Sequence, residues 1–445
     1  MKVSCSSSHF KEKLRQYNKR ERCLNSMGRV SPCLLCSLVA TTIFIFFLLS
    51  SPNPINSITK PDIHDQKLAS TNQQNDPFHP QTDTTLKIND TIQVVDKCDL
   101  FDGHWIPDLN GSRYTNSSCA TIPHSKNCFK HGRGDIDFLN WRWKPHQCNL
   151  QRFDAKVFFT IVRGKRMSFI GDSVARNHME SLLCLLSQEE TPIDIYKDSE
   201  NRNRIWYFAK HNFTLTTLWT KFFVNGKERV INGSRSAIYD LYLDKVEDNW
   251  VRDLPSIDYA VISGAHWLFR PLYLHKGGNT IGCVYCDEPN ITRVDVSFAV
   301  RLTLRAALNH IDRCKICKKM VTLVRTFSPS HFENGTWNTG GTCNRTSPFA
   351  EKNADLNGWE VGMRNVQVEE VERVRKRGNW SGKRFGVLDV TRAMLMRPDG
   401  HPGAFSGNKW MRGYNDCVHW CLPGPIDVWN DFLIAVLGQE AWKTS

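Results

Sequence analysis

Short apolar runs alternate with longer amphipathic stretches through the second half of the chain. The runs with the length of strands are 259–263, 320–325 and 385–390. The stretches with apolar positions at helical spacing are 295–313, 362–377 and 426–437. Strands separated by helices predict a mostly parallel sheet with helices on both faces. We therefore expect an α/β fold of the doubly wound type.

The most informative pattern is an apolar strand that runs into Gly171-Asp172-Ser173 and is followed by a helix. Gly171 permits a tight turn that a side chain would obstruct. Ser173 then lies where strand becomes helix, with its hydroxyl exposed and its amide free to bind an oxyanion. This setting predicts a nucleophile, and the alternative is a turn closed by Asp172. We expect Asp172 to bond the amides of its own turn. The apolar positions near one face of the helix are Val174, Met179, Leu182, Leu183 and Leu186.

A candidate base lies far downstream, where Asp416 precedes His419 by three residues. This spacing can bring the carboxylate to the imidazole and fix its tautomer, so that the other ring nitrogen faces Ser173. Ser173, Asp416 and His419 are therefore the predicted catalytic residues. Three other histidines are rival bases, although none has a carboxylate three residues before it in a comparable C-terminal position: His266, His331 and His401.

The pattern of the N-terminal region predicts a membrane anchor. Residues 1–30 carry eight basic and two acidic side chains, a net charge of +6, and an apolar run at 31–50 follows. This order predicts a cytosolic tail, a transmembrane signal anchor and a lumenal remainder. A cleaved signal peptide is the alternative. Residues 51–97 are polar and aperiodic, which predicts a disordered stem before a folded domain at 98–445.

Composition supports an oxidising, lumenal compartment. The chain of 445 residues has nine Asn-x-Ser/Thr sequons, against about three expected from average composition. Twelve of the 16 cysteines follow the anchor, so disulfides are the default. The net charge of +13 lies partly in the tail and forms no basic stripe on a known motif, which argues against nucleic-acid binding. The remaining basic charge could attract an anionic polymer or donor.

Together these motifs resemble the GDSL or SGNH hydrolases and, more closely, the plant trichome birefringence-like (PC-esterase) family of polysaccharide O-acetyltransferases. The resemblance covers roughly residues 98–442. Besides the Ser173 and His419 segments, it rests on CDLFDGHW at 98–105, WRW at 141–143, RFD at 152–154, HFENG at 331–335 and GGTCNR at 340–345. It implies an SGNH-hydrolase-like domain with a smaller disulfide-rich lobe, in which residues 98–150 wrap the core as extended chain and loops.

The resemblance also implies the chemistry. The family transfers acetyl groups through an acetyl-serine, with no bound cofactor or metal and with acetyl-CoA as the presumed donor. Segments resembling the xyloglucan subgroup are AHWLFR at 265–270, GCVYC at 282–286 and PNIT at 289–292. Alternatives are a mannan or xylan O-acetyltransferase, a carbohydrate acetylesterase and a non-catalytic wall-polymer binding protein. The expected partners are a polysaccharide acceptor, the membrane and other Golgi acetylation-pathway proteins. The expected location is the Golgi membrane, as a single-pass type II protein with a lumenal catalytic domain.

Further residues are candidates for the oxyanion or the substrate. Arg176 and Asn177 lie one helical turn after Ser173 and could reach back to it, or else cap the surface. Where the family usually has Asn-x-Gly-His-Trp, this chain has Ser263 and Ala265 in place of the Asn and the Gly. The Gly264 amide or the Ser263 hydroxyl could replace the missing amide donor. The remaining substrate-binding candidates in this set are Gly171, Asp172, His266 and Trp267. Tryptophans that would stack on sugars, or else belong to the core, are Trp267, Trp410 and Trp420.

Two groups of cysteines are expected to form disulfides, and the pairing of the second group is implied only by the family resemblance. Cys283 and Cys286, together with Cys314 and Cys317, have the spacing of a zinc site. In an oxidising compartment we favour two disulfides. The family architecture implies the pairs Cys98–Cys148, Cys119–Cys184, Cys128–Cys421 and Cys343–Cys417. The last two would hold the loop that carries His419.

Overall fold

The computed structural model describes residues 98–317, 319–377, 382–408 and 413–442. The predicted tail, anchor and stem at 1–97 lie outside these residues. Within the described ranges, no helix is long and apolar enough to span a membrane.

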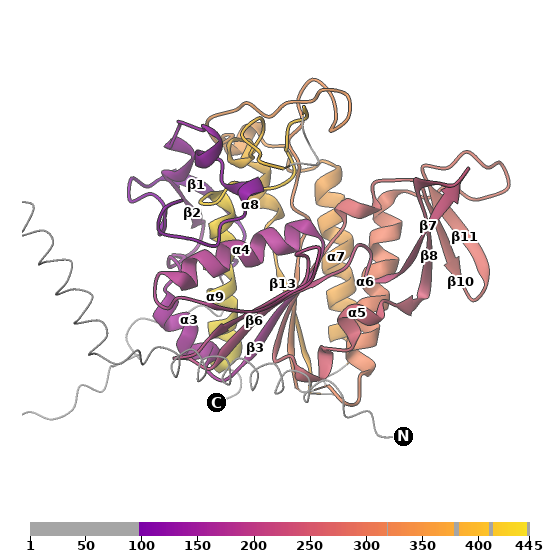
Figure 1. The fold of residues 1–445 in the computed structure, drawn as a ribbon, viewed down its shortest axis with the longest axis horizontal. Helices are drawn as coiled ribbons and strands as arrows, with labels where there is room; N and C mark the ends of the chain where they lie inside the picture. Colours follow the sequence, from indigo (N-terminus) through magenta and orange to yellow (C-terminus); the bar gives the residue numbers. More distant parts are fainter. Residues whose placement is uncertain (1–97, 318, 378–381, 409–412, 443–445) are drawn as a thin grey trace, which may run out of the picture. The chain divides into compact units, whose positions relative to one another are not determined.

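A seven-stranded sheet forms the centre of the described domain (Figure 1). Its order is β13-β12-β9-β3-β6-β5-β4, and the first five strands are parallel to one another. β5 pairs antiparallel with both of its neighbours. The bounds are β3 (Arg166–Gly171), β4 (Ile193–Lys197), β5 (Arg204–Phe208), β6 (Phe213–Trp219), β9 (Tyr259–Ser263), β12 (Val321–Arg325) and β13 (Arg384–Leu388).

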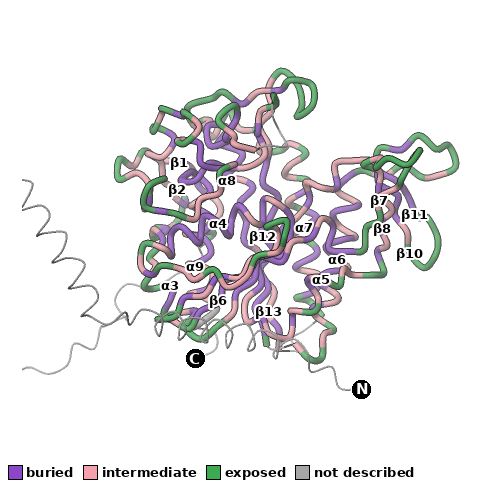
Figure 2. Tube along the Cα trace, viewed as in Figure 1, coloured by how far each residue is buried: buried purple, intermediate pink, exposed green. Residues whose placement is uncertain are grey.

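Helices cover both faces of this sheet. One face packs against α3 (Ala155–Val162), α4 (Ser173–Ser187) and α9 (Val428–Trp442). The other packs against α5 (Asp248–Val251), α6 (Val296–Arg313) and α7 (Trp359–Arg375). Met167 and Phe169 of β3 belong to the first core, whereas Ile170 belongs to the second, as the alternation of a strand requires. The central strands are accordingly largely buried (Figure 2). The predicted doubly wound α/β fold is confirmed.

The predicted elements match the observed ones closely. The helices expected at 295–313, 362–377 and 426–437 correspond to α6, α7 and α9, and the expected strands correspond to β9, β12 and β13. Aspartates cap three helix starts by accepting backbone amides of the first turn: Asp154, Asp172 and Asp295. The short 3-10 segments are His124–Lys126, Phe129–His131, Asp137–Leu139, Leu254–Ser256, His266–Leu268, Glu351–Asn353, Pro398–Gly400 and Pro425–Asp427.

A second, four-stranded sheet is the main element that the sequence does not predict. Its order is β11-β10-β8-β7, and it packs through an apolar cluster on α6 and the start of α7. The bounds are β7 (Val224–Ile231), β8 (Ser234–Val246), β10 (Leu272–Lys276) and β11 (Asn279–Val284). β7 is exposed over much of its length and carries charged residues, so it lacks the apolar pattern by which a buried strand is recognised.

Residues 98–150 form the predicted cysteine-rich lobe. It contains one antiparallel pair, β1 (Gly103–Pro107) with β2 (Trp141–Pro145), and otherwise short turns. Short helix α8 (Thr391–Leu395) contacts β1. All four disulfides implied by the family resemblance are present, and two of them join this lobe to α4 and to the His419 loop. The two CxxC pairs are each bonded internally, as disulfides rather than a zinc site.

We expect the long-range disulfide to stabilise the domain more than a local one. Cys128 and Cys421 are 293 residues apart, whereas Cys314 and Cys317 are three apart. Because a cross-link restricts the unfolded chain more when its loop is longer, a Cys128→Ala/Cys421→Ala double variant should lose roughly 2–5 kcal/mol. The matched Cys314→Ala/Cys317→Ala variant should lose less. Scanning calorimetry under non-reducing conditions compares them, and a larger loss in the local pair would contradict this account.

Candidate active site

The end of β3 approaches the end of β9 so closely that only glycine fits. Gly171 has φ +156, and a Cβ there would lie 1.7 Å from the carbonyl oxygen of Ser263. No side chain can be accommodated at that distance. Gly171 is therefore structural, as the sequence predicts for a tight turn, and it allows the chain to enter α4 at Ser173.

Asp172 shapes the turn rather than reacting. Its Oδ1 accepts the amide of Val174 at 2.9 Å and that of Ala175 at 3.4 Å. The predicted role of Asp172 in its own turn is thus confirmed. Burial favours the neutral acid, but the neighbouring His266 and Arg325 and the Val174 amide lower the pKa of Asp172 to about 2. The carboxylate stays charged behind the half-buried Ser173.

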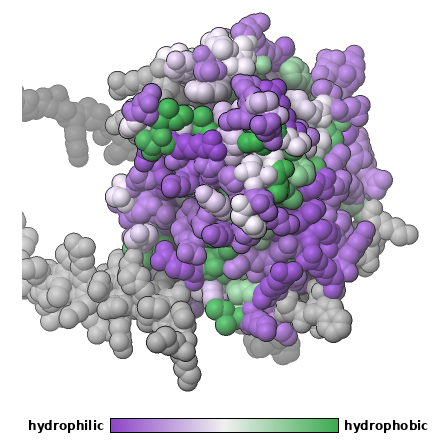
Figure 3. Space-filling view, turned by 90° about the vertical axis from the view of Figure 1, so that its right-hand side faces the viewer, coloured by the Kyte–Doolittle hydropathy of each residue, from purple (hydrophilic) through white to green (hydrophobic). Residues whose placement is uncertain are grey.

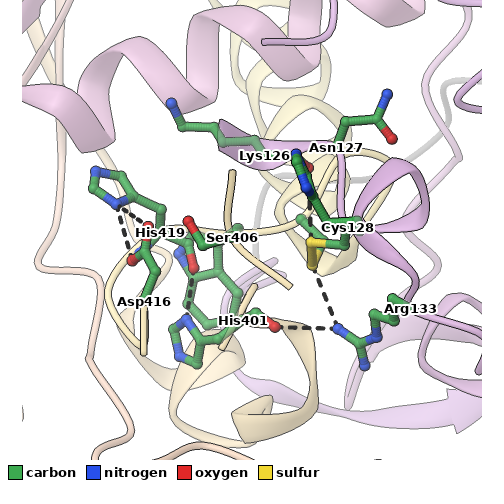
Figure 4. Close-up of a disulfide and its surroundings, with 12 residues drawn as sticks. Lys126, Asn127, Cys128, Arg133, His401, Ser406, Asp416 and His419 are labelled. Atoms are coloured by element: carbon green, nitrogen blue, oxygen red, sulfur yellow. Dashed lines mark hydrogen bonds and ion pairs between the residues drawn. A yellow bond between two sulfur atoms is a disulfide. The ribbon is translucent and has the colours of Figure 1, made fainter. Parts of the chain in front are cut away.

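Asp416 and His419 form the predicted pair (Figure 4). His419 Nδ1 lies 3.0 and 2.9 Å from the two oxygens of Asp416. Since a carboxylate only accepts, Nδ1 carries the hydrogen and Nε2 keeps its lone pair. Burial favours a neutral Asp416, but His419 and the loop amides lower the pKa of Asp416 well below its usual range. Nε2 is buried and has no hydrogen-bond partner among the described residues, so it is free to accept a proton.

Asn177 connects the serine helix to the histidine loop. Its Oδ1 accepts the amide of Trp420 at 2.8 Å, and its Nδ2 donates to the carbonyl of Trp420 at 3.3 Å. The side chain is fully buried. Both polar atoms of its amide hold the residue that follows His419, which favours a structural role, and the oxyanion role of Asn177 stays a prediction. Within the described residues, Ser173 and His419 share no hydrogen bond. Catalytic hydrogen bonds often tighten only when substrate binds.

Two disulfides and one backbone pairing hold the loop from Asp416 to Cys421. Cys417 is bonded to Cys343, and Cys421 to Cys128. Asp416 exchanges backbone hydrogen bonds with Gly403 at 3.0 and 3.1 Å. The loop is thus attached to three separate parts of the chain. This rigidity suits a base that must keep its geometry for proton transfer.

His331 and His401 also support the loop instead of competing for the reaction. His401 Nδ1 lies 2.7 Å from the carbonyl oxygen of His419, and His401 Nε2 lies 2.7 Å from His331 Nδ1. A carbonyl only accepts, so His401 donates through Nδ1 and accepts through Nε2 from His331. Burial lowers the pKa of His331 to about 4 and that of His401 well below its usual range.

The contacts of both rings favour this supporting role. The ring nitrogens of His401 face the carbonyl of His419 and the ring of His331, and those of His331 face His401 and the carbonyl of Leu395, the latter at 3.2 Å. Both rings are largely buried. All four nitrogens thus face protein groups, whereas Nε2 of His419 has no hydrogen-bond partner among the described residues.

Two further candidates for binding the oxyanion or the substrate are Arg176 and His266, and both contact other parts of the protein. Arg176 forms an ion pair with Glu180 at 3.0 Å and donates to the carbonyl of Asn201 at 2.7 Å, which favours its structural alternative. His266 donates from Nε2 to the carbonyl of Ser328 at 3.0 Å, and its Nδ1 lies 3.8 Å from Asp172.

The position of Gly264 agrees with its predicted place beside the nucleophile. Gly264 follows β9, and a Cβ there would lie 3.9 Å from Asp172 Oδ2 and 3.1 Å from the ring of Phe223. The Ser263 hydroxyl is buried without a hydrogen-bond partner in the described residues. The oxyanion roles of both residues stay predictions.

The tryptophans differ in exposure. Trp420 is completely buried and donates to Ser328, so the hypothesis that it stacks on a sugar is wrong. Trp267 is partly exposed, with Arg270 4.0 Å and Lys221 4.6 Å from its ring centre. Its sugar contact stays a prediction. Trp410 lies outside the described residues.

One buried charge near the site was missed by sequence reasoning. Arg325 ends β12, is 2% exposed and donates to the carbonyl of Thr326 at 2.8 Å. Burial lowers the pKa of Arg325 to about 10, while the charge of Asp172 opposes that change. No sequence pattern marks it, because an arginine at a strand end is normally solvated. In the described ranges, no cluster of three or more metal-ligating side chains occurs.

Comparison with known proteins places this site in a family. Residues 150–436 match the PC-esterase model, described as a GDSL/SGNH-like acyl-esterase family found in Pmr5 and Cas1p. Residues 96–149 match the PMR5 N-terminal domain. The chain is 61% identical to xyloglucan O-acetyltransferase 4 of Populus trichocarpa, covering 98% of this chain and 97% of that protein.

Two further relatives extend the comparison. Xyloglucan O-acetyltransferase 2 of Arabidopsis thaliana is 54% identical, over 98% of this chain and all of that protein. Protein trichome birefringence-like 20 of the same plant is 40% identical, over 84% of this chain and 82% of that protein. The chain belongs to the PC-esterase family, as its motifs and its α/β fold lead one to expect.

Replacing Asp416 with asparagine should leave the loop in place but misorient the histidine. An amide can donate to Nδ1, which moves the hydrogen to Nε2 and removes the lone pair that faces Ser173. The corresponding change in a serine protease costs about ten-thousandfold in kcat. We expect a comparable fall for Asp416→Asn in acetyl transfer, with an unchanged circular dichroism spectrum. Asp244→Asn, an exposed aspartate on β8, is the control. A loss below about tenfold would mean that another group orients His419.

Replacing His401 tests whether it positions His419. His401→Ala removes the donor to the His419 carbonyl, and kcat should fall by up to about a hundredfold as the base shifts, with little change in KM. His401→Asn places an N–H near the former Nδ1 and should restore much of kcat. His310→Ala, on α6, is the control. Equal kcat in the alanine and asparagine variants, both folded, would show that this hydrogen bond does not position the base.

Proposed function

We propose that the protein is an O-acetyltransferase that acetylates a plant cell-wall hemicellulose, xyloglucan, through an acetyl-serine on Ser173. The observation that carries the proposal is the contact of Asp416 with His419 Nδ1, together with a buried Nε2 that has no hydrogen-bond partner among the described residues. Relatives named xyloglucan O-acetyltransferases at 61% and 54% identity over nearly the whole chain support the substrate.

The reaction has two symmetrical halves. In the first, His419 Nε2 takes the proton of Ser173 while the serine oxygen attacks the acetyl carbonyl of the donor. The donor we propose is acetyl-CoA, whose thiolate leaves and receives that proton. In the second, His419 deprotonates a sugar hydroxyl, which attacks the acetyl-serine. The Ser173 oxygen leaves and regains the proton, so the enzyme returns to its first state.

The negative charge that develops on the acetyl carbonyl oxygen during the attack must be stabilised by hydrogen-bond donors. The amide of Ser173 begins α4, where the helix dipole favours negative charge. Gly264 lies on the neighbouring strand end, where a Cβ would be 3.9 Å from Asp172 Oδ2. We propose the amides of Ser173 and Gly264 as the oxyanion hole. They replace the Asn side chain that this chain lacks at Ser263.

The location we propose is the Golgi membrane, with residues 31–50 as the anchor and residues 98–445 in the lumen. Six disulfides support an oxidising compartment. All seven sequon asparagines in the described ranges are exposed: Asn110, Asn116, Asn212, Asn232, Asn290, Asn334 and Asn344. Exposure is what a glycosylated asparagine requires. Other proteins of the Golgi acetylation pathway are the partners this location makes available.

A donor and acceptor assay tests the function. The full-length protein in detergent is incubated with isotope-labelled acetyl-CoA and with xyloglucan, xylan or mannan oligosaccharides, and the products are read by mass spectrometry. We expect label on Ser173 without acceptor and on the xyloglucan oligosaccharide with it. Ser173→Ala should abolish both. Label released only as free acetate would favour an acetylesterase, and no label anywhere would favour a non-catalytic binding protein.

A further inference from the structure

A polar cavity of about 260 Å³ lies one strand away from the nucleophile. Its wall includes Trp219 at the end of β6, with Arg202, Asn203, Lys221, Glu247 and Asn249 around it. In the sheet, Trp219 is aligned with Gly171 of the neighbouring β3, two residues before Ser173. The amide of Thr220 donates to the carbonyl of Gly171 at 2.8 Å. The cavity is therefore fixed directly to the turn that presents the nucleophile.

The walls of this cavity are held in place by their own contacts. The amide of Trp219 donates to Asn203 Oδ1 at 2.8 Å, and its carbonyl accepts from Asn249 Nδ2 at 3.0 Å. The guanidinium of Arg202 lies 4.6 Å from the indole centre. Arg176 of α4 donates to the carbonyl of Asn201, the residue before Arg202. A preformed wall of this kind keeps down the ordering cost of binding.

The charge of the cavity disfavours an anion. Three carboxylates, Asp198, Glu200 and Glu247, line it against two cations, Arg202 and Lys221. Arg202 is already paired with Glu200 at 2.7 Å. A donor that carries several phosphates would meet a net negative lining, which is unfavourable. The phosphate groups of an acyl donor therefore have no complementary surface here.

The same lining suits a neutral, hydroxyl-rich ligand. Carboxylates and amide oxygens accept from hydroxyl groups, and Lys221 donates to them. The Oδ1 atom of Asn249 is buried without a hydrogen-bond partner among the described residues. An indole beside such groups supplies the apolar contact that a sugar ring needs. The face that carries the neighbouring four-stranded sheet is also mainly hydrophilic (Figure 3).

We propose that this cavity is an acceptor subsite that binds a neutral glycosyl residue of the polysaccharide, adjacent to the residue that Ser173 acetylates. The inference rests on the proposed function, which makes the acceptor a polysaccharide. It adds on which side of Ser173 that polysaccharide lies. The other side of the same sheet edge offers a rival platform. Trp359, at the start of α7, is 52% exposed, and its ring centre lies 5.4 Å from that of Phe327, which follows β12.

Binding measured without turnover separates this proposal from the chemistry. In the full-length Ser173→Ala protein, titration with a xyloglucan oligosaccharide gives Kd by calorimetry. Adding Trp219→Ala should weaken binding on the order of tenfold, which corresponds to about 1.4 kcal/mol. Trp219→Phe should recover part of it. Arg202→Ala, which truncates a side chain that is 43% exposed, should weaken binding in the same direction.

Trp359→Ala provides the matched control, because it removes an exposed indole on the opposite side of Ser173. We expect it to leave Kd unchanged. In proteins with an intact Ser173, Trp219→Ala should raise the acceptor KM by a larger factor than it lowers the rate of acetyl-serine formation from acetyl-CoA. Unchanged Kd in both Trp219→Ala and Arg202→Ala, or a loss confined to Trp359→Ala, would overturn the subsite. Normal oligosaccharide binding without any acetyl transfer would instead refute the proposed function alone.

Discussion

The whole site depends on one amide side chain that bonds the backbone of one residue. Asn177 bonds both the N–H and the carbonyl of Trp420, across 243 residues of sequence. Ser173 lies one helical turn before Asn177, and His419 lies directly before Trp420. The two hydrogen bonds thus fix nucleophile and base relative to each other, although Ser173 and His419 share no hydrogen bond in the described residues. A buried amide with both partners satisfied is strongly directional, since any shift of the loop leaves polar groups unpaired.

Two buried aspartates near the site carry the same charge but have different roles. Asp172 receives backbone amides and holds the turn, whereas Asp416 receives the imidazole and fixes its tautomer. Each remains ionised because its surroundings provide compensating partners. The buried cation of Arg325 contributes to this balance at Asp172. Removing a partner would leave an unpaired buried charge, which is among the most costly changes a core can suffer.

The sequence predicts those parts of the site that depend on local pattern. The strand, turn and helix around Ser173 follow from apolar periodicity and one glycine, and the Asp416–His419 contact follows from their spacing. The role of Asn177 could not be predicted, because a contact across the whole domain leaves no local trace. The hydrogen bond from His401 to the His419 carbonyl could not be predicted from the sequence for the same reason. The disulfide pairs were available only through family resemblance, since spacing alone allows many pairings.

The long separation of Cys128 from Cys421 has a consequence for biosynthesis. At about 5–20 residues per second, a ribosome needs roughly 15–60 s to synthesise the 293 residues between them. Throughout that interval Cys128 has no native partner, while Cys98 and Cys148, and then Cys119 and Cys184, can already join. The base loop also emerges well after the serine helix. The nascent chain therefore carries its serine without its histidine for most of this interval, and native pairing of Cys128 must wait until Cys421 has been synthesised.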